Sequence, residues 1–141
     1  MRAHHSGSRI VSTIRYRDAA AAIDWLCDAF GFDRHLIVPA LDGTVAHAQL
    51  VHGSGMVMIG TARDDEYGAL VRPPDQSYDA TTQGNYVIVA DPDAHHDAAV
   101  AAGAHVVLPL VDQIQGGRAY TCRDPEGHVW TFGDYDPWQD D

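Results

Sequence analysis

The nine histidines of this chain are its first candidates for chemistry, because imidazole is both a metal ligand and a general base near neutral pH. His95 and His96 are adjacent on a predicted helix, where consecutive side chains point about 100° apart, so they do not hold one ion together. His35 and His105 begin equivalent predicted strands, which favours a structural role. His128 follows the glycine of a predicted turn, where a hydrogen bond at the strand end is the simpler interpretation.

His47 has a different setting, because it shares one face of a predicted strand with Gln49, opposite apolar neighbours. Such a polar pair either lines a binding cavity or faces solvent. Arg118 also has two interpretations: its guanidinium either binds an anionic ligand group or forms a structural ion pair with a carboxylate. Tyr120, two residues further on, is a candidate for the border of a pocket.

The charge balance limits the classes of partner. Nine Lys and Arg residues against 20 Asp and Glu residues give a formal net charge of -11, and no basic cluster occurs, which argues against nucleic acid. No apolar run approaches the ~18 residues that span a bilayer, so we expect no membrane segment. A neutral or cationic small molecule suits this balance better than an anionic polymer.

The cysteines and the N-terminus indicate a cytoplasmic protein. Cys27 and Cys122 lie in no CxxC pair and fall in a predicted helix and strand, so we expect buried thiols. Residues 1–8 lack the apolar centre of a signal peptide and are interpreted as a disordered or added tail. No nucleophile-elbow, P-loop or dinucleotide-binding pattern occurs.

Hydrophobic spacing predicts the same order of elements, strand, helix and three strands, on both sides of a polar segment. Asp18 and Asp91 precede the two helices as N-caps, and Gly31 and Gly103 follow them. The first set is expected at residues 10–16, 19–30, 35–40, 45–51 and 56–61. The second is expected at residues 85–90, 92–102, 105–112, 119–123 and 128–133. Residues 62–83 are too long for an ordinary connection, which indicates a linker or a cavity lid.

The similarity between the two sets predicts a duplicated βαβββ module. The segments 35–42 and 105–112 both carry His, Pro and Asp at the same places, an offset of 70 residues, and the closing strands place Thr131 opposite Met58. A module of about 55 residues cannot bury both faces of its own sheet, so two must combine. The predicted fold class is α+β, with two βαβββ modules forming a curved, cavity-enclosing mixed sheet and the helices on the outside.

The stretch 123–135 is the most explicit local signal. Asp124, Pro125 and Gly127 suit the first, second and fourth positions of a type I turn. In the strand that follows, Trp130 and Phe132 share the face opposite Thr131, so we expect the two aromatic rings to pack under a helix.

Together, the two modules, the Phe30-Gly-Phe32 end of the first helix and the closing Asp124-Pro-Glu-Gly-His-Val-Trp130 resemble the vicinal oxygen chelate superfamily of glyoxalase I, bleomycin-resistance proteins and extradiol dioxygenases. The resemblance covers residues 9–137 and implies a single domain of that type, with module one at 9–61, a linker at 62–83 and module two at 84–137. Gly117-Arg118 with the closing motif looks most like the glyoxalase-like, PhnB-like branch.

The metal enzymes of this superfamily place His or Glu on the first and last strand of each module. Counting from the helix caps and the closing strands, those positions are Val11, Met58, Asn85 and Thr131. Divalent transition ions prefer imidazole, carboxylate or thiolate, and this set offers none. The resemblance therefore implies a member without the family's metal site or any other cofactor.

The leading hypothesis is a metal-free small-molecule-binding protein of the glyoxalase/bleomycin-resistance type, which sequesters a drug or toxin and forms a homodimer. The alternative is a glyoxalase-like lyase or isomerase with a non-standard metal or acid/base site, built from His47, Gln49 or His128. A third class is an interaction module with a vestigial cavity. The predicted ligand-binding residues are His47, Gln49, Met58, Asn85, Arg118, Tyr120 and Thr131; no metal ligand, nucleic acid or membrane partner is predicted.

Overall fold

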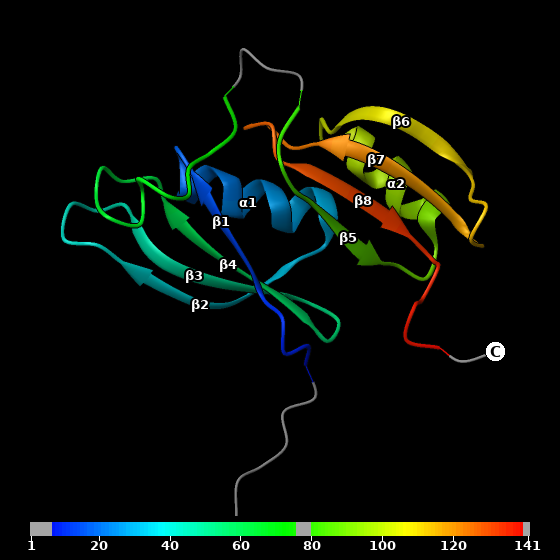
Figure 1. Ribbon diagram of the computed structural model, residues 1–141, viewed down its shortest axis with the longest axis horizontal. Helices are drawn as coiled ribbons and strands as arrows, with labels where there is room; N and C mark the ends of the chain where they lie inside the picture. The colour runs from blue at the N-terminus through cyan, green and yellow to red at the C-terminus, as the bar shows by residue number, and fades with distance from the viewer. Residues whose placement is uncertain (1–6, 76–79, 140–141) are drawn as a thin grey trace, which may run out of the picture. The chain divides into compact units, whose positions relative to one another are not determined.

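The chain folds into two compact units, residues 1–73 and 74–141, in a computed structural model that describes residues 7–75 and 80–139. Each unit contains a four-stranded sheet and one helix (Figure 1). The predicted fold class, α+β with two βαβββ modules, is confirmed. The boundary between the units falls within the predicted linker at 62–83. Neither helix in the described residues is long and apolar enough to cross a membrane.

Unit 1 comprises β1 (Ser12–Tyr16), α1 (Ala19–Phe30), β2 (Asp33–Pro39), β3 (Val45–His52) and β4 (Gly55–Thr61). The strand order is β1-β4-β3-β2, with β1 parallel to β4 and the other pairs antiparallel. The return of the last strand to the first places β1 and β4 side by side. Side chains of β1 therefore lie beside those of β4, although paired residues such as Thr13 and Met58 are 45 positions apart in the sequence.

Helix α1 begins and ends where the sequence predicts. The Asp18 side chain accepts a hydrogen bond from Ala21 N, and Gly31 ends the helix with a φ of 83°, which favours glycine. Ile23, Leu26 and Phe30 form its buried stripe and pack on the sheet residues Ile14, Leu50 and Ile59, which are also buried. One face of the first sheet is thus buried against α1 and forms the core of unit 1.

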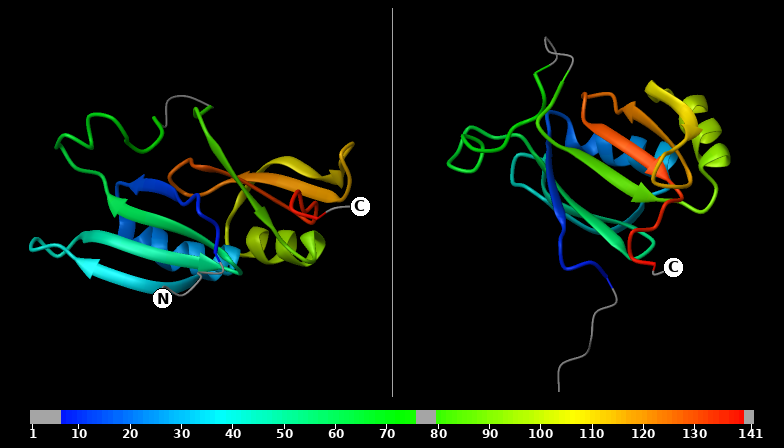
Figure 2. Two further views of the ribbon diagram at one scale, coloured as in Figure 1. Left: turned by 60° about the horizontal axis from the view of Figure 1, so that its bottom comes forward. Right: turned by 45° about the vertical axis from the view of Figure 1, so that its right-hand side comes forward.

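Unit 2 comprises β5 (Gly84–Ile88), α2 (Pro92–Ala101), β6 (His105–Asp112), β7 (Arg118–Arg123) and β8 (Val129–Gly133) (Figures 1 and 2). Its strand order, β5-β8-β7-β6, has the same topology as that of unit 1. The Asp91 side chain caps α2 by accepting from Ala94 N. Gly103, predicted to follow the helix, has a φ of 100°.

The core of unit 2 is aromatic. Trp130, Phe132 and Tyr120 are almost fully buried, and the His95 ring of α2 stacks on Phe132 with 4.1 Å between ring centroids. His95 Nδ1 and the Tyr120 hydroxyl also form a 2.5 Å hydrogen bond. The prediction that Trp130 and Phe132 pack under a helix is confirmed.

The thiols of the chain are both free, but only one is fully buried. Cys122 lies in the core of unit 2, where burial raises its pKa to about 12. Cys27 on α1 is partly exposed. The expectation of two buried thiols is therefore confirmed for Cys122 only.

The register of the repeat differs from the one predicted. Leu108 pairs with Thr121 as Leu36 pairs with Gln49, an offset of 72 residues, and each outer strand has an irregularity at the same place. The equivalent of His105 is therefore Asp33, not His35. The predicted offset of 70 is wrong because it aligned letters within one strand, whereas hydrogen bonding to the neighbouring strand sets the register.

Asp124 organises the turn before β8. Gly127 N donates to Asp124 O at 2.9 Å, which closes the predicted turn. One carboxylate oxygen accepts from the backbone N–H groups of Glu126 and His128, and the other accepts from the Trp130 indole N–H at 3.0 Å. This carboxylate is buried, so its removal leaves several buried donors without an acceptor.

We expect Asp124→Ala to lower the free energy of unfolding by about 3 kcal/mol. The substitution removes charge-assisted hydrogen bonds to the backbone and leaves the buried Trp130 indole N–H without its acceptor. Urea unfolding followed by tryptophan fluorescence measures the change. Asp97→Ala is the control, since Asp97 is exposed and bonds His96 beside it; its effect should stay within about 0.5 kcal/mol. Equal losses in the two variants would contradict this role for Asp124.

Candidate ligand-binding site

Each sheet has one face packed on its helix and a second face, here called the open face, turned away from it. On the open face of unit 1, one row of paired residues crosses all four strands: Thr13, Met58, Gln49 and Leu36. A neighbouring row contains Arg15 beside Gly60, and His47 beside Val38. Leu36 and Val38 are both at least 40% exposed. This face therefore combines hydrogen-bonding groups with apolar surface.

His47 and Gln49 act as a pair on this face. His47 Nε2 lies 3.0 Å from Gln49 Oε1, and both side chains are partly buried. Because the amide oxygen only accepts, Nε2 carries the proton in this hydrogen bond and Nδ1 is an acceptor in the neutral ring. The pair thus holds the imidazole in one tautomer, with Nδ1 able to accept a proton or a hydrogen bond.

The Arg15 guanidinium lies over Gly60 on the neighbouring strand. A Cβ at position 60 would come within 3.4 Å of the guanidinium carbon, so glycine leaves the space that the side chain occupies. Arg15 Nη1 donates to Thr61 O at 2.8 Å. The guanidinium carbon lies 4.6 Å from the centroid of the Tyr67 ring, a cation–π distance. Arg15 is therefore held between the sheet and an aromatic ring.

Tyr67 comes from the segment after β4, which was predicted to be a linker or a lid. Its hydroxyl forms a 2.9 Å hydrogen bond with Thr13 Oγ1. A turn presents the ring: Asp65 Oδ1 accepts from Gly68 N at 2.8 Å, and Val71 N donates to the Tyr67 carbonyl at 2.9 Å. Tyr67 thus covers Thr13 and Arg15, which form one corner of the open face of unit 1.

Arg63 fixes the start of this segment to the β2–β3 turn. Its guanidinium donates to Thr44 Oγ1 at 2.6 Å and to Asp42 at 3.3 Å. Hydrogen bonds from the Thr44 side chain and backbone, with a smaller contribution from Arg63, lower the pKa of Asp42 to about 2. The carboxylate is therefore charged at neutral pH and retains Arg63.

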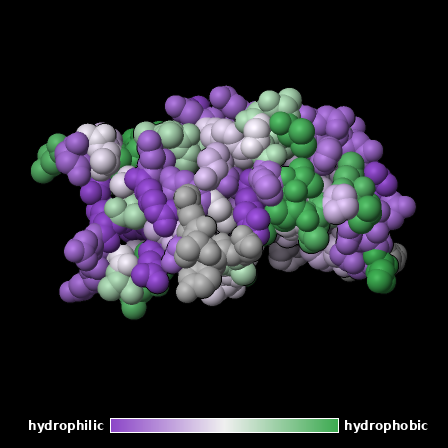
Figure 3. All heavy atoms as spheres, turned by 90° about the horizontal axis from the view of Figure 1, so that it is seen from above, coloured by the Kyte–Doolittle hydropathy of each residue, from purple (hydrophilic) through white to green (hydrophobic). Residues whose placement is uncertain are grey.

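The open face of unit 2 is less polar in its chemistry, although β5, β8 and β7 pair in the same register as β1, β4 and β3 do in unit 1. Its equivalent rows are Tyr86, Thr131, Thr121 and Leu108, then Ile88, Gly133, Ala119 and Val111. The Thr121 and Thr131 hydroxyls bond each other at 2.7 Å, and the Tyr86 hydroxyl donates to Tyr135 O at 2.7 Å. Hydrophobic patches among hydrophilic residues are visible on the molecular surface (Figure 3).

The structure separates the predicted ligand-binding residues into four groups, of which Arg118 is described below. His47, Gln49 and Met58 lie together on the open face of unit 1, and Thr131 lies on that of unit 2. Asn85 pairs with Trp130, and Tyr120 pairs with Phe132, so both lie on the helix-packed face of unit 2. Tyr120 is 1% exposed and bonds His95, so it does not border an open face.

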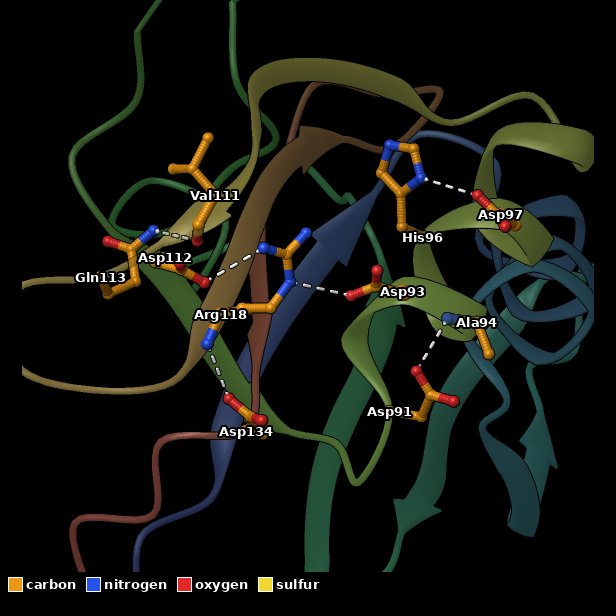
Figure 4. A network of polar contacts seen from close by, with 10 residues as sticks. All are labelled: Asp91, Asp93, Ala94, His96, Asp97, Val111, Asp112, Gln113, Arg118 and Asp134. Carbon is orange, nitrogen blue, oxygen red and sulfur yellow. Dashed lines mark hydrogen bonds and ion pairs between the residues drawn. The ribbon is translucent and has the colours of Figure 1, made fainter.

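Arg118 belongs to an ion-pair network at one end of unit 2 (Figure 4). Its Nε donates to Asp93 at 3.0 Å, its Nη1 donates to Asp112 at 3.1 Å, and its backbone N–H donates to Asp134 at 2.8 Å. The hydrogen bonds to Asp93 and Asp112 raise the pKa of Arg118. The guanidinium thus joins α2 to β6, and the backbone N–H joins β7 to the residue after β8. Of its two interpretations, Arg118 has the structural one, an ion pair with carboxylates.

The positions implied for a metal need a correction on both first strands. Thr13, not Val11, lies beside Met58, and Tyr86, not Asn85, lies beside Thr131. The miscount arose because hydrogen bonding to the last strand, rather than distance from the helix cap, sets the register. The corrected side chains are thioether, hydroxyl and phenol groups, which do not fit a divalent transition ion. In residues 7–75 and 80–139, no three His, Cys, Asp or Glu side chains are grouped to hold one.

Sequence reasoning missed Tyr67 and gave Arg15 no specific place. Arg15 alternates with the buried Ile14 and Tyr16, so strand parity alone assigns it to the open face. No periodic signal surrounds Tyr67, because it lies in an irregular polar segment. Its contacts follow from the tertiary fold.

Comparisons with known proteins agree with this architecture. A family model, "Glyoxalase/Bleomycin resistance protein/Dioxygenase superfamily", matches residues 6–132. TioX from Micromonospora sp. ML1 is 38% identical in sequence, with a TM-score of 0.70 over 90% of this chain and 98% of that one. A Mycobacterium bovis protein described as uncharacterized is 36% identical over 82% of this chain and 76% of its own length.

Lactoylglutathione lyase from Agrobacterium tumefaciens, at 22% identity and a TM-score of 0.63 over 94% of this chain and 98% of that one, shares the fold. The family-model match covers most of the sequence, and it agrees with the two βαβββ units and with the TioX structure. The chain therefore belongs to the glyoxalase/bleomycin resistance protein/dioxygenase superfamily.

Proposed function

We propose that the protein binds a small organic molecule on the open face of unit 1 without a metal ion, and that it sequesters this molecule as a drug or toxin. The observation that carries the proposal is the mixed chemistry of that face. His47, Gln49 and Arg15 provide oriented polar groups beside apolar side chains, a combination typical of ligand sites.

The apolar part of this face suits the body of such a molecule. Met58 stands between Thr13 and Gln49, and its flexible thioether adapts to different shapes. Leu36 and Val38 extend the apolar surface on β2. The absence of imidazole or carboxylate at the family's ligand positions supports binding over metal-assisted turnover.

The His47–Gln49 hydrogen bond favours a second candidate function, a glyoxalase-like lyase or isomerase. With Nε2 donating to Gln49, Nδ1 can take a proton from a substrate carbon or oxygen. This activity would need no metal ligand. It differs from sequestration in that substrate is consumed, and His47→Gln would abolish turnover while leaving the apolar contacts intact.

Ligands found by a thermal-shift screen should bind His47→Leu at least about tenfold more weakly than the wild type, because one partly buried hydrogen bond is lost. Met58→Ala should lower the affinity for the same ligands, because apolar contact with the Met58 side chain is lost. Isothermal titration calorimetry measures both effects. His96→Ala is the matched control, because that imidazole lies on α2 in the other unit. Unchanged affinity in both test variants would refute the site.

Incubation with Zn²⁺, Ni²⁺, Mn²⁺ or Fe²⁺ followed by desalting should leave far less than a stoichiometric amount of metal on the protein, because the corrected donor set does not fit these ions. Elemental analysis of the desalted protein measures the bound ion. A stoichiometric ion that is lost on Met58→Ala or Thr131→Ala would contradict the metal-free proposal.

The proposal includes a cytoplasmic homodimer. The two free thiols suit a reducing compartment, and the outer strand β6 exposes Leu108 and Val111, an apolar surface that a second copy could cover. We expect analytical ultracentrifugation to give about twice the 15.3 kDa mass of the chain. A species at the mass of one chain across the micromolar range would contradict the dimer.

A further inference from the structure

The most specific contact on the open face of unit 1 is made by the protein's own phenol ring. Tyr67 lies against the Arg15 guanidinium at 4.6 Å and bonds Thr13 through its hydroxyl at 2.9 Å. Gly60 leaves room for the guanidinium beneath the ring, since a Cβ at this position would come within 3.4 Å of it. Sheet, cation and ring are therefore stacked in that order, with the hydroxyl directed to a second strand residue.

Tyr67 itself belongs to neither a strand nor a helix. It lies in a short turn after β4 and is 38% exposed. The turn is closed by local hydrogen bonds of Asp65, and Arg63 anchors its start to Asp42 and Thr44. These anchors do not involve the ring, so the ring can leave the sheet by side-chain rotation while the turn keeps its own contacts.

We infer that the Tyr67 ring occupies the place of a ligand ring, so that this corner of the face selects flat phenol-like molecules. Such a molecule would displace Tyr67, stack on Arg15 and bond Thr13. The inference rests on the proposed function, because it names the class of ligand for the same face. It assigns Arg15 and Thr13 as selecting residues and Tyr67 as the internal competitor.

The ligand chemistry follows from what the corner already accommodates. A guanidinium favours the face of an aromatic ring, more so when both are partly desolvated. Thr13 Oγ1 can donate or accept, so it suits a phenol hydroxyl. A ring without a hydroxyl keeps the cation–π contact with Arg15 and loses the hydrogen bond to Thr13. A saturated ring of similar size loses both.

The test uses p-cresol, the side chain of tyrosine as a free molecule, and isothermal titration calorimetry on the full chain. Tyr67→Ala should bind p-cresol about tenfold more tightly than the wild type, because the internal competitor is gone. Tyr67→Phe removes only the hydroxyl bond and should give a smaller gain. Adding Arg15→Met to Tyr67→Ala should abolish the gain, and adding Thr13→Val should reduce p-cresol binding to the level of toluene.

Two outcomes would overturn the inference: no gain in either Tyr67 variant, or a gain that persists with Arg15→Met. The urea midpoint of each variant shows whether it is folded, and Tyr67→Phe keeps the ring packing if Tyr67→Ala does not fold. The result is separable from the proposed function. If His47→Leu weakens ligands from the screen while the Tyr67 variants bind p-cresol like the wild type, the face binds ligands but Tyr67 does not compete for them.

Discussion

The packing of one helix on one face of each sheet is the constraint on which the rest of the structure depends. In unit 1, Leu26 and Phe30 of α1 bury the face that carries Ile14, Leu50 and Ile59. Because side chains alternate along a strand, every residue next to those core positions is assigned to the other face. Arg15, Gln49 and Met58 are on the open face as a consequence of what the core requires.

The same constraint explains why the two units resemble each other in register and differ in chemistry. The helix-packed faces must be apolar in both, and Trp130 and Phe132 fill this role in unit 2 as Val57 and Ile59 do in unit 1. The open faces have no such requirement. Arg15 and His47 in unit 1 therefore correspond to Ile88 and Ala119 in unit 2, which makes the first face the more polar one.

The sequence predicted most of the elements, since caps, alternation and turn chemistry are local. Asp18, Gly31 and Asp124 each mark a boundary by a mechanism that acts within a few residues. It predicted register less well, because the pairing of Tyr86 with Thr131 depends on a strand more than 40 residues away. The position of Asn85 was misjudged for this reason. Tyr67 was missed because its partners are in β1 and its own segment has no periodic pattern.

Met58 offers the most direct test of the central claim, that the open face of unit 1 is a metal-free ligand site. The chain has three methionines, so their ε-methyl groups give a simple NMR spectrum when labelled with ¹³C. Addition of a ligand that stabilises the protein should shift the Met58 signal in metal-free buffer, with saturation that follows the binding isotherm. A ligand that binds fully while the Met58 signal stays unchanged would contradict the account.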